Sequence, residues 1–188
     1  PRPPLSAVDE LSRISVLGVP VDALDLPALL ERADAFVAGR TPRQIITANA
    51  LMLLAAEKDP GLARAFDAAD LVVPDSAGVF LAARLAGRPL PEKIPGIALM
   101  EALCARAAAR GWRVFLLGAA PGVAADVAEK LKVKYSGLNV AGTQDGHFTL
   151  KGSPLPPGRV GEGAGGQISL DEDQVIHRIA AAAPALLF

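Results

Sequence analysis

The sequence predicts an α/β protein of the Rossmann-like class, with a mostly parallel sheet and helices on both of its faces. Two observations support this fold class. Short apolar runs alternate along the chain with helical segments of about 10 to 15 residues, which is the pattern of βαβ units. The apolar runs are also continuous rather than alternating with polar residues, as expected for strands that are buried on both faces.

Local signals place the strands and helices in order. Apolar runs predict strands at residues 14–19, 43–47, 71–74, 113–117 and 138–141, and one that starts at residue 185. Apolar residues at helical spacing predict helices at residues 26–38, 50–55, 60–68, 77–85, 96–110, 123–134 and 171–183. Asp25 and Asn49 are expected to cap two of these helices, Pro60 suits the first position of another, and residues 169–172 have the pattern of a capping box.

The composition is that of a folded domain. Of the 188 residues, 51% are apolar and 21% are charged, so the chain can form a core and general disorder is excluded. Lys and Arg total 19 against 20 for Asp and Glu, and this near-neutral balance excludes an electrostatic nucleic-acid binder. One cysteine, Cys104, which falls in an apolar helical pattern, and two histidines are too few for a standard zinc site, so no metal is expected.

The domain is expected to span residues 14–188, after an N-terminal tail at residues 1–13. The chain shows no signal peptide, and no uncharged apolar run reaches the roughly 18 residues of a membrane span. We therefore expect a cytosolic protein. Residues 151–167, which are rich in Pro and Gly, are expected to form a flexible loop.

Ligands of open α/β sheets bind beyond the carboxyl ends of the strands, and three polar segments fall there. Thr47 and Asn49 follow the strand at residues 43–47, where a hydroxyl and an amide can orient a sugar or a phosphate; the alternative is that they only cap the next helix. Asp75 follows the strand at residues 71–74, in the position of a general base, and its alternative is again a helix cap.

The third segment is the loop at residues 118–122, between a strand and a helix. Its glycines allow backbone amides to approach a phosphate, and the following helix N-terminus adds a favourable dipole. The candidate phosphate contacts are Gly118, Ala119, Pro121 and Gly122. The loop lacks the spacing of the dinucleotide fingerprint, and a simple tight turn would explain it equally well.

Two further polar groups have simpler interpretations. The basic residues Arg84, Arg88 and Lys93 can meet an anionic ligand, although a solvated surface also explains them. Asp145 and His147 flank a glycine, and we expect a turn with a solvated histidine rather than an acid–base pair.

Several segments, taken in order, resemble the WecG/TagA/CpsF family of bacterial glycosyltransferases. They are IITAN at residues 45–49, ADLVVPDSAGV at 69–79, LAGRPLPEKIPG at 85–96, FLLGAAPGVA at 115–124, and GLNVAGT with DGHF at 137–143 and 145–148. No single segment is specific, but their order along the chain is. The match runs from about residue 14 to residue 148 and resumes at residues 171–183.

The resemblance implies a function. Members of the family transfer an N-acetylmannosamine-type sugar from a UDP donor to polyprenyl-diphosphate-linked N-acetylglucosamine, in the synthesis of teichoic acid or related surface polysaccharides. They look like inverting, metal-independent enzymes without a cofactor, and they work at the cytoplasmic face of the membrane. A homo-oligomer is expected from the family and from the exposed surface that an unfinished last strand would leave.

The resemblance also implies roles for residues. The catalytic aspartate of the family falls on Asp75, as base for the acceptor hydroxyl, and its active-site threonine falls on Thr47, with Asn49 alongside. The loop at residues 118–122 then becomes a nucleotide-sugar contact, and Arg88 and Lys93 become candidate substrate contacts.

Four positions depart from the family pattern. Ser76 stands where glycine usually follows the aspartate, and Lys93 replaces an arginine. Ala98 stands where an acidic residue is common, and His147 replaces a tyrosine. The family also continues into a Gly-rich motif and a membrane-binding appendage beyond the last strand, so we expect a C-terminally truncated chain whose membrane contact depends on the missing region.

Two other functions remain open from the sequence. One is a different α/β nucleotide-binding enzyme, such as a dehydrogenase or a methyltransferase, against which the missing dinucleotide fingerprint argues. The other is a truncated, non-catalytic core that self-associates through an uncovered sheet edge.

Overall fold

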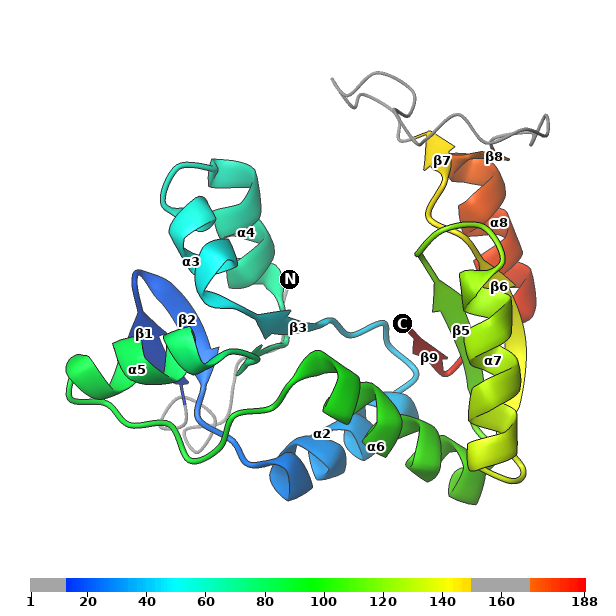
Figure 1. Ribbon diagram of the computed structural model, residues 1–188, viewed down its shortest axis with the longest axis horizontal. Coiled ribbons are helices and arrows are strands. Elements are labelled where there is room, and N and C mark those ends of the chain that lie inside the picture. Colours follow the sequence, from blue (N-terminus) through cyan, green and yellow to red (C-terminus); the bar gives the residue numbers. More distant parts are fainter. Residues whose placement is uncertain (1–12, 150–169) are drawn as a thin grey trace. The chain divides into compact units, whose positions relative to one another are not determined.

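The computed structural model describes residues 13–149 and 170–188 (Figure 1). The predicted tail, the Pro/Gly-rich loop at residues 151–167 and Ser169 of the expected capping box lie outside these residues, apart from Arg13. The chain divides into two compact units, Pro1–Glu101 and Ala102–Phe188, which we call unit 1 and unit 2 and describe separately. The expectation of one domain over residues 14–188 stays a prediction.

The described part of unit 1 begins with a β-hairpin, which the sequence did not predict. Strands β1 (Arg13–Val16) and β2 (Val19–Asp22) pair antiparallel, where we expected one strand over residues 14–19. The connection has two residues, Leu17 and Gly18, with φ of 51° and 79°. Two positive φ values in a two-residue loop match the right-handed twist of the strands, but Leu at the first position hides this signal in the sequence.

The centre of unit 1 is a parallel pair of strands, β3 (Ile45–Ala48) and β4 (Leu71–Pro74). All four residues of β4 are buried, as its apolar sequence predicted. Between them run two short helices that lie side by side, α3 (Ala50–Ala56) and α4 (Pro60–Ala68) (Figure 1). The core of this unit combines residues of β1, β2 and β4 with Leu53 and Phe66 from the two helices.

Three more helices complete the first part of the chain. Helix α2 (Leu26–Ala38) begins after Asp25, whose carboxylate accepts the N–H of Ala28, as predicted. Helix α5 (Ala77–Leu85) follows β4, and α6 (Gly96–Arg110) begins in unit 1 and ends in unit 2. Cys104 of α6 is fully buried, which agrees with its placement in an apolar helical pattern.

Unit 2 is built on a parallel sheet with the strand order β6–β5–β9. Its strands are β5 (Arg113–Leu117), β6 (Asn139–Gln144) and β9 (Leu186–Leu187), and helix α7 (Val123–Lys134) connects the first two. The strand expected from residue 185 is therefore present, paired with β5. β6 runs three residues beyond the predicted end of this strand.

The last elements of unit 2 are a short parallel pair and a helix. They are β7 (Phe148–Thr149), β8 (Leu170–Asp171) and α8 (Glu172–Ala182). The capping box of α8 is formed by Asp171 and Gln174 rather than by residues 169–172. With helices between parallel strands in both units, the predicted α/β class is confirmed. No helix in the described part of the chain is long and apolar enough to cross a membrane.

Candidate active site

The two residues predicted to be catalytic lie at the ends of neighbouring strands. Thr47 of β3 pairs in register with Val73 of β4, and Asp75 is the first residue after β4. The backbone N–H of Asp75 donates to the carbonyl of Ala48 at 2.9 Å, which extends the ladder to the start of the next loop. The parallel pairing therefore brings the hydroxyl and the carboxylate to the same edge, as the sequence analysis expected.

Asp75 does not cap the helix that follows it. The N-cap of α5 is Ser76, which makes no side-chain capping bond, so the cap interpretation of Asp75 is wrong. Its Oδ1 instead accepts the backbone N–H of Gly96, the first residue of α6, at 3.3 Å. The half-buried carboxylate is thus held by one N–H, and no other hydrogen bond to it occurs within residues 13–149 and 170–188.

Gly96 also approaches Thr47 closely. A Cβ added to Gly96 would lie 3.1 Å from Oγ1 of Thr47 and 3.6 Å from its Cβ and Cγ2. A second link joins the segment before α6 to β4, because Ile94 N–H donates to the Pro74 carbonyl at 2.8 Å. Thr47, Asp75 and the start of α6 therefore form one cluster, and we call these three groups the strand-end cluster.

Asn49 is the helix cap that one of its two interpretations predicted. Its Oδ1 accepts the N–H of Met52 at 3.0 Å, at the start of α3. The Asn49 amide nitrogen has no hydrogen bond to the described part of the chain, so a ligand role for that donor is compatible with the cap. Ser76 contacts the same helix start, since its Oγ accepts the Ala50 N–H at 3.2 Å.

The basic candidates lie on the segment between α5 and α6. Arg88 and Lys93 are exposed, and within the described ranges neither side chain has a hydrogen bond or an ion pair. Glu92, between them, accepts the N–H of Leu26 at 2.8 Å and so fixes this segment to the start of α2. The positioning role of Glu92 and Gly96 was missed, because both bonds join residues far apart in the sequence.

In unit 2, the predicted phosphate loop has the unusual backbone that its glycines suggested. Gly118, Ala119 and Gly122 have φ of 131°, 62° and 86°. The loop is tied to the turn after β6, because Gly118 N–H donates to the Gln144 carbonyl at 2.8 Å and Gly146 N–H to the Ala119 carbonyl at 2.9 Å. Pro121 is exposed, and the N-cap of α7 is Gly122, which has no side chain to cap the helix.

The environment of His147 differs from the expected solvated turn. The side chain is only 29% exposed, and its Nδ1 is buried at 3.8 Å from Asp145 Oδ1 without a hydrogen bond. The Asp145 carboxylate accepts the backbone N–H of His147 at 2.9 Å, which forms the predicted turn.

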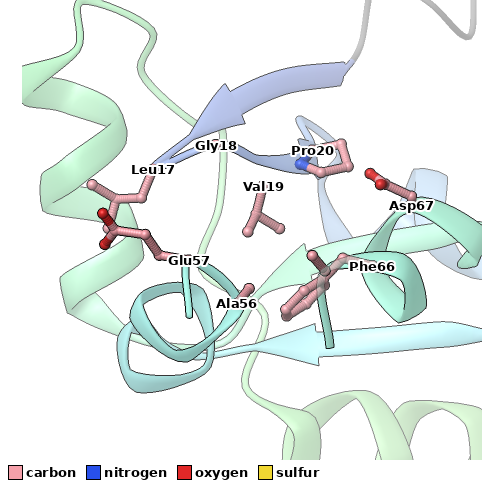
Figure 2. A pocket seen from close by; sticks show the side chains of 9 residues that line it. Leu17, Gly18, Val19, Pro20, Ala56, Glu57, Phe66 and Asp67 are labelled. Carbon is pink, nitrogen blue, oxygen red and sulfur yellow. The ribbon is translucent and has the colours of Figure 1, made fainter. Parts of the chain in front are cut away.

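Unit 1 contains a small cavity of about 180 Å³ (Figure 2). Val19 and Phe66 form part of its apolar wall, and Glu57 and Asp67 lie at its margins. It borders the last residues of α3, at the opposite end of that helix from Asn49. It contains none of the predicted site residues, so the strand ends remain the candidate site. The described residues contain no group of three or more metal-ligating side chains.

A hydroxyl, a carboxylate and a helix start at the carboxyl ends of parallel strands define an α/β protein with a polar ligand site. The model of the Glycosyl transferase WecG/TagA/CpsF family matches residues 14–188. The chain therefore belongs to this family.

One relative is the N-acetylglucosaminyldiphosphoundecaprenol N-acetyl-beta-D-mannosaminyltransferase of Bacillus spizizenii (strain W23). It is 30% identical to the chain over 144 residues, and the alignment covers 77% of the chain and 48% of the relative. The chain thus spans about half the length of the curated relative that it matches.

Proposed function

We propose that the protein transfers N-acetylmannosamine, or a related N-acetylhexosamine or uronic acid, from a UDP donor to polyprenyl-diphosphate-linked N-acetylglucosamine. Family membership and the name of the B. spizizenii relative support the reaction class and the lipid-linked acceptor. The observation that supports the mechanism is the Asp75 carboxylate after β4, held by Gly96 N–H beside Thr47.

In this mechanism Asp75 is the general base. Oδ1 is engaged by the Gly96 N–H, so Oδ2 accepts the proton of the acceptor hydroxyl. The acceptor oxygen, as it loses this proton, attacks the anomeric carbon from the face opposite the UDP group. The bond from this carbon to the phosphate oxygen breaks, its electron pair leaves with UDP, and the anomeric configuration inverts.

The remaining candidates bind the substrates. Thr47 is proposed to orient the reacting sugar by a hydrogen bond from its hydroxyl, and the Asn49 amide to donate to a substrate oxygen. Arg88 and Lys93 would balance the negative charge of a diphosphate. In unit 2, backbone N–H groups of the loop formed by Gly118, Ala119, Pro121 and Gly122 are proposed to contact the phosphates of the donor. The reaction as proposed uses no metal or cofactor.

Asp75→Asn tests the assignment of the base. Asn keeps an oxygen that accepts the Gly96 N–H but cannot take up a proton, so we expect transfer to fall roughly 10²–10⁴-fold with little loss of stability. Asp25→Asn is a matched control, because Asn caps a helix as well as Asp does, and its activity should be unchanged. Transfer by Asp75→Asn within about tenfold of the parent would show that Asp75 is not the base.

Two measurements test the reaction itself. Labelled UDP-N-acetylmannosamine and a short-chain lipid acceptor should yield a disaccharide product, and NMR of its glycosidic bond should show inversion relative to the donor. A thermal-shift comparison of UDP-sugars with NAD and S-adenosylmethionine distinguishes the other α/β enzymes. Stabilisation by the last two alone would reject a glycosyltransferase.

We further propose that the protein acts at the cytoplasmic face of the membrane and forms a homo-oligomer. The lipid-linked acceptor named for the relative supports the first point, and the family resemblance is the basis of the second. Sedimentation velocity over a range of protein concentrations tests the oligomer, and a single monomer species throughout would contradict it.

A further inference from the structure

Three helices begin at the strand-end cluster, and close contacts join their starts. Ala50 of α3 donates its N–H to Ser76 Oγ, and Ser76 is the N-cap of α5. Gly96 of α6 donates its N–H to Asp75. A Cβ on Gly78 of α5 would lie only 2.8 Å from the Cβ of Ala50, so the first turns of α3 and α5 are in close contact. Residues in the first turns of these helices therefore surround the cluster.

Large apolar side chains are exposed on these same helices. Leu51 in the first turn of α3 is 78% exposed, and Ile97 in the first turn of α6 is 65% exposed. On α5, Leu81 and Leu85 are 57% and 79% exposed and lie four residues apart, on one face of the helix. Isolated exposed leucines are ordinary, but several large exposed apolar side chains on three helices that begin at one polar site indicate a contact surface.

The charge of α5 indicates the kind of partner. Arg84 is exposed on the last turn of this helix, between the two leucines of the apolar face. Residues 76–91 contain two arginines and no acidic residue. Exposed leucines beside Arg84, with Arg88 shortly after the helix, suit a surface that combines apolar chains with negative head groups. An anionic lipid bilayer has both properties.

We infer that Leu51, Leu81, Leu85, Ile97 and Arg84 form a docking surface for an anionic lipid bilayer, which we call the lipid-facing rim. The inference rests on the proposed function, since a lipid-linked acceptor must be met at the membrane surface. It assigns membrane contact to helices that begin at the candidate active site. The acceptor's diphosphate and sugar would then enter beside Asp75 while its polyprenyl chain stays in the bilayer.

Flotation with phosphatidylcholine vesicles, with and without phosphatidylglycerol, tests the rim. The parent protein should float with the anionic vesicles and less so at high salt. Leu81→Gln with Leu85→Gln should weaken binding at least about tenfold, because two apolar anchors are lost. Arg84→Gln should weaken it roughly fivefold on anionic vesicles only. Val133→Gln, a change at an 87% exposed residue of α7, is the control and should bind as the parent does.

Several results would overturn the inference. A parent protein that does not float would contradict it, and so would a double leucine variant that is folded by circular dichroism and floats as well as the parent. A third contrary result combines two measurements. In sedimentation the parent would be an oligomer and the leucine variant a monomer, while in flotation the two proteins would behave alike. In that case the surface joins two copies of the chain.

Transfer assays separate this inference from the proposed function. The double leucine variant should use a short-chain, water-soluble acceptor as well as the parent does, and should lose at least about tenfold with a long-chain acceptor in vesicles. Equal loss on both acceptors would contradict a lipid-facing role. If the parent itself fails with the soluble acceptor, the proposed function fails, and flotation still decides whether the rim binds lipid.

Discussion

Gly96 reaches Thr47 so closely that a Cβ on the glycine would lie 3.1 Å from the threonine Oγ1. The same glycine donates its N–H to Asp75. One residue at the start of α6 thus sets the position of both groups proposed to act on the substrate. Because the contact needs a position without a side chain, its importance for transfer can be tested by adding one methyl group.

Gly96→Ala should lower the rate of transfer about tenfold, because a shift of a few tenths of an ångström at Thr47 or Asp75 spoils the reacting geometry. The free energy of unfolding should change by less than about 1 kcal/mol, since Ala also favours the helix. Steady-state kinetics and urea unfolding measure the two effects.

The matched comparison is Gly96→Ala in a Thr47→Ala background. With the Thr47 side chain reduced to a methyl, the alanine at residue 96 has room, so it should cost little further activity. Equal losses from Gly96→Ala in both backgrounds would show that the contact with Thr47 does not transmit the effect.

Local signals in the sequence predicted most of the helices. Contacts between residues far apart in the sequence could not be predicted. The caps Asp25 and Asn49 each bond to a backbone N–H three residues ahead, so composition and spacing predict them correctly. The bond from Gly96 to Asp75 spans 21 residues and depends on how α6 packs. For that reason the strand ends could be identified as the site, while the group that holds the carboxylate could not.

The cap interpretation of Asp75 shows a second limit. Asp directly before a helix is a common N-cap, and Ser76 occupies that position here without a capping bond. If the helix began one residue earlier, Asp75 would be its cap; because it begins after Ser76, the Asp75 carboxylate does not cap it. The first residue of a helix cannot be predicted from sequence to within one residue. The pairing of β4 with β3 ends at Pro74, so Asp75 lies in the loop, and this pairing is known only from the fold.

Ser76→Ala should destabilise the protein by about 1 kcal/mol. The change leaves the first N–H of α3, on Ala50, without the acceptor that lies 3.2 Å away. Ser76→Thr retains the hydroxyl and should recover most of the loss, which distinguishes the hydrogen bond from simple packing. Urea unfolding compares the three proteins. Equal stability of the Ala and Thr variants would show that the bond contributes nothing.

Asp22→Ala should destabilise unit 1 by about 3–5 kcal/mol, because the largely buried Arg13 guanidinium loses its carboxylate and keeps only its bond to the Asp70 carbonyl at 3.2 Å. Asp22 is 4% exposed and receives two bonds from Arg13, at 3.0 and 2.9 Å, and one from the Val72 N–H at 2.7 Å. It therefore joins the hairpin to β4, the strand that leads to Asp75.

An exposed ion pair provides the control for Asp22. Lys132→Gln removes the ion pair between Lys132 and Glu129, whose side chains are 43% and 73% exposed, respectively. This change should lower the free energy of unfolding by less than about 1 kcal/mol. Arg13→Ala should add little to Asp22→Ala, because the pair is already broken. Additive losses in the double variant would mean that the two residues act independently.

Gly142→Ala should destabilise unit 2 by about 1–3 kcal/mol through overpacking. A Cβ at this position would lie 2.6 Å from Cε2 of Phe115, a residue that is only 2% exposed. The two residues are partners where the β5–β6 register shifts, so the irregular pairing depends on the missing side chain. In a Phe115→Leu background the added methyl should cost much less, since the ring edge is gone. Urea unfolding of the four proteins gives the coupling energy, and a value near zero would show that the contact with Phe115 does not explain the glycine.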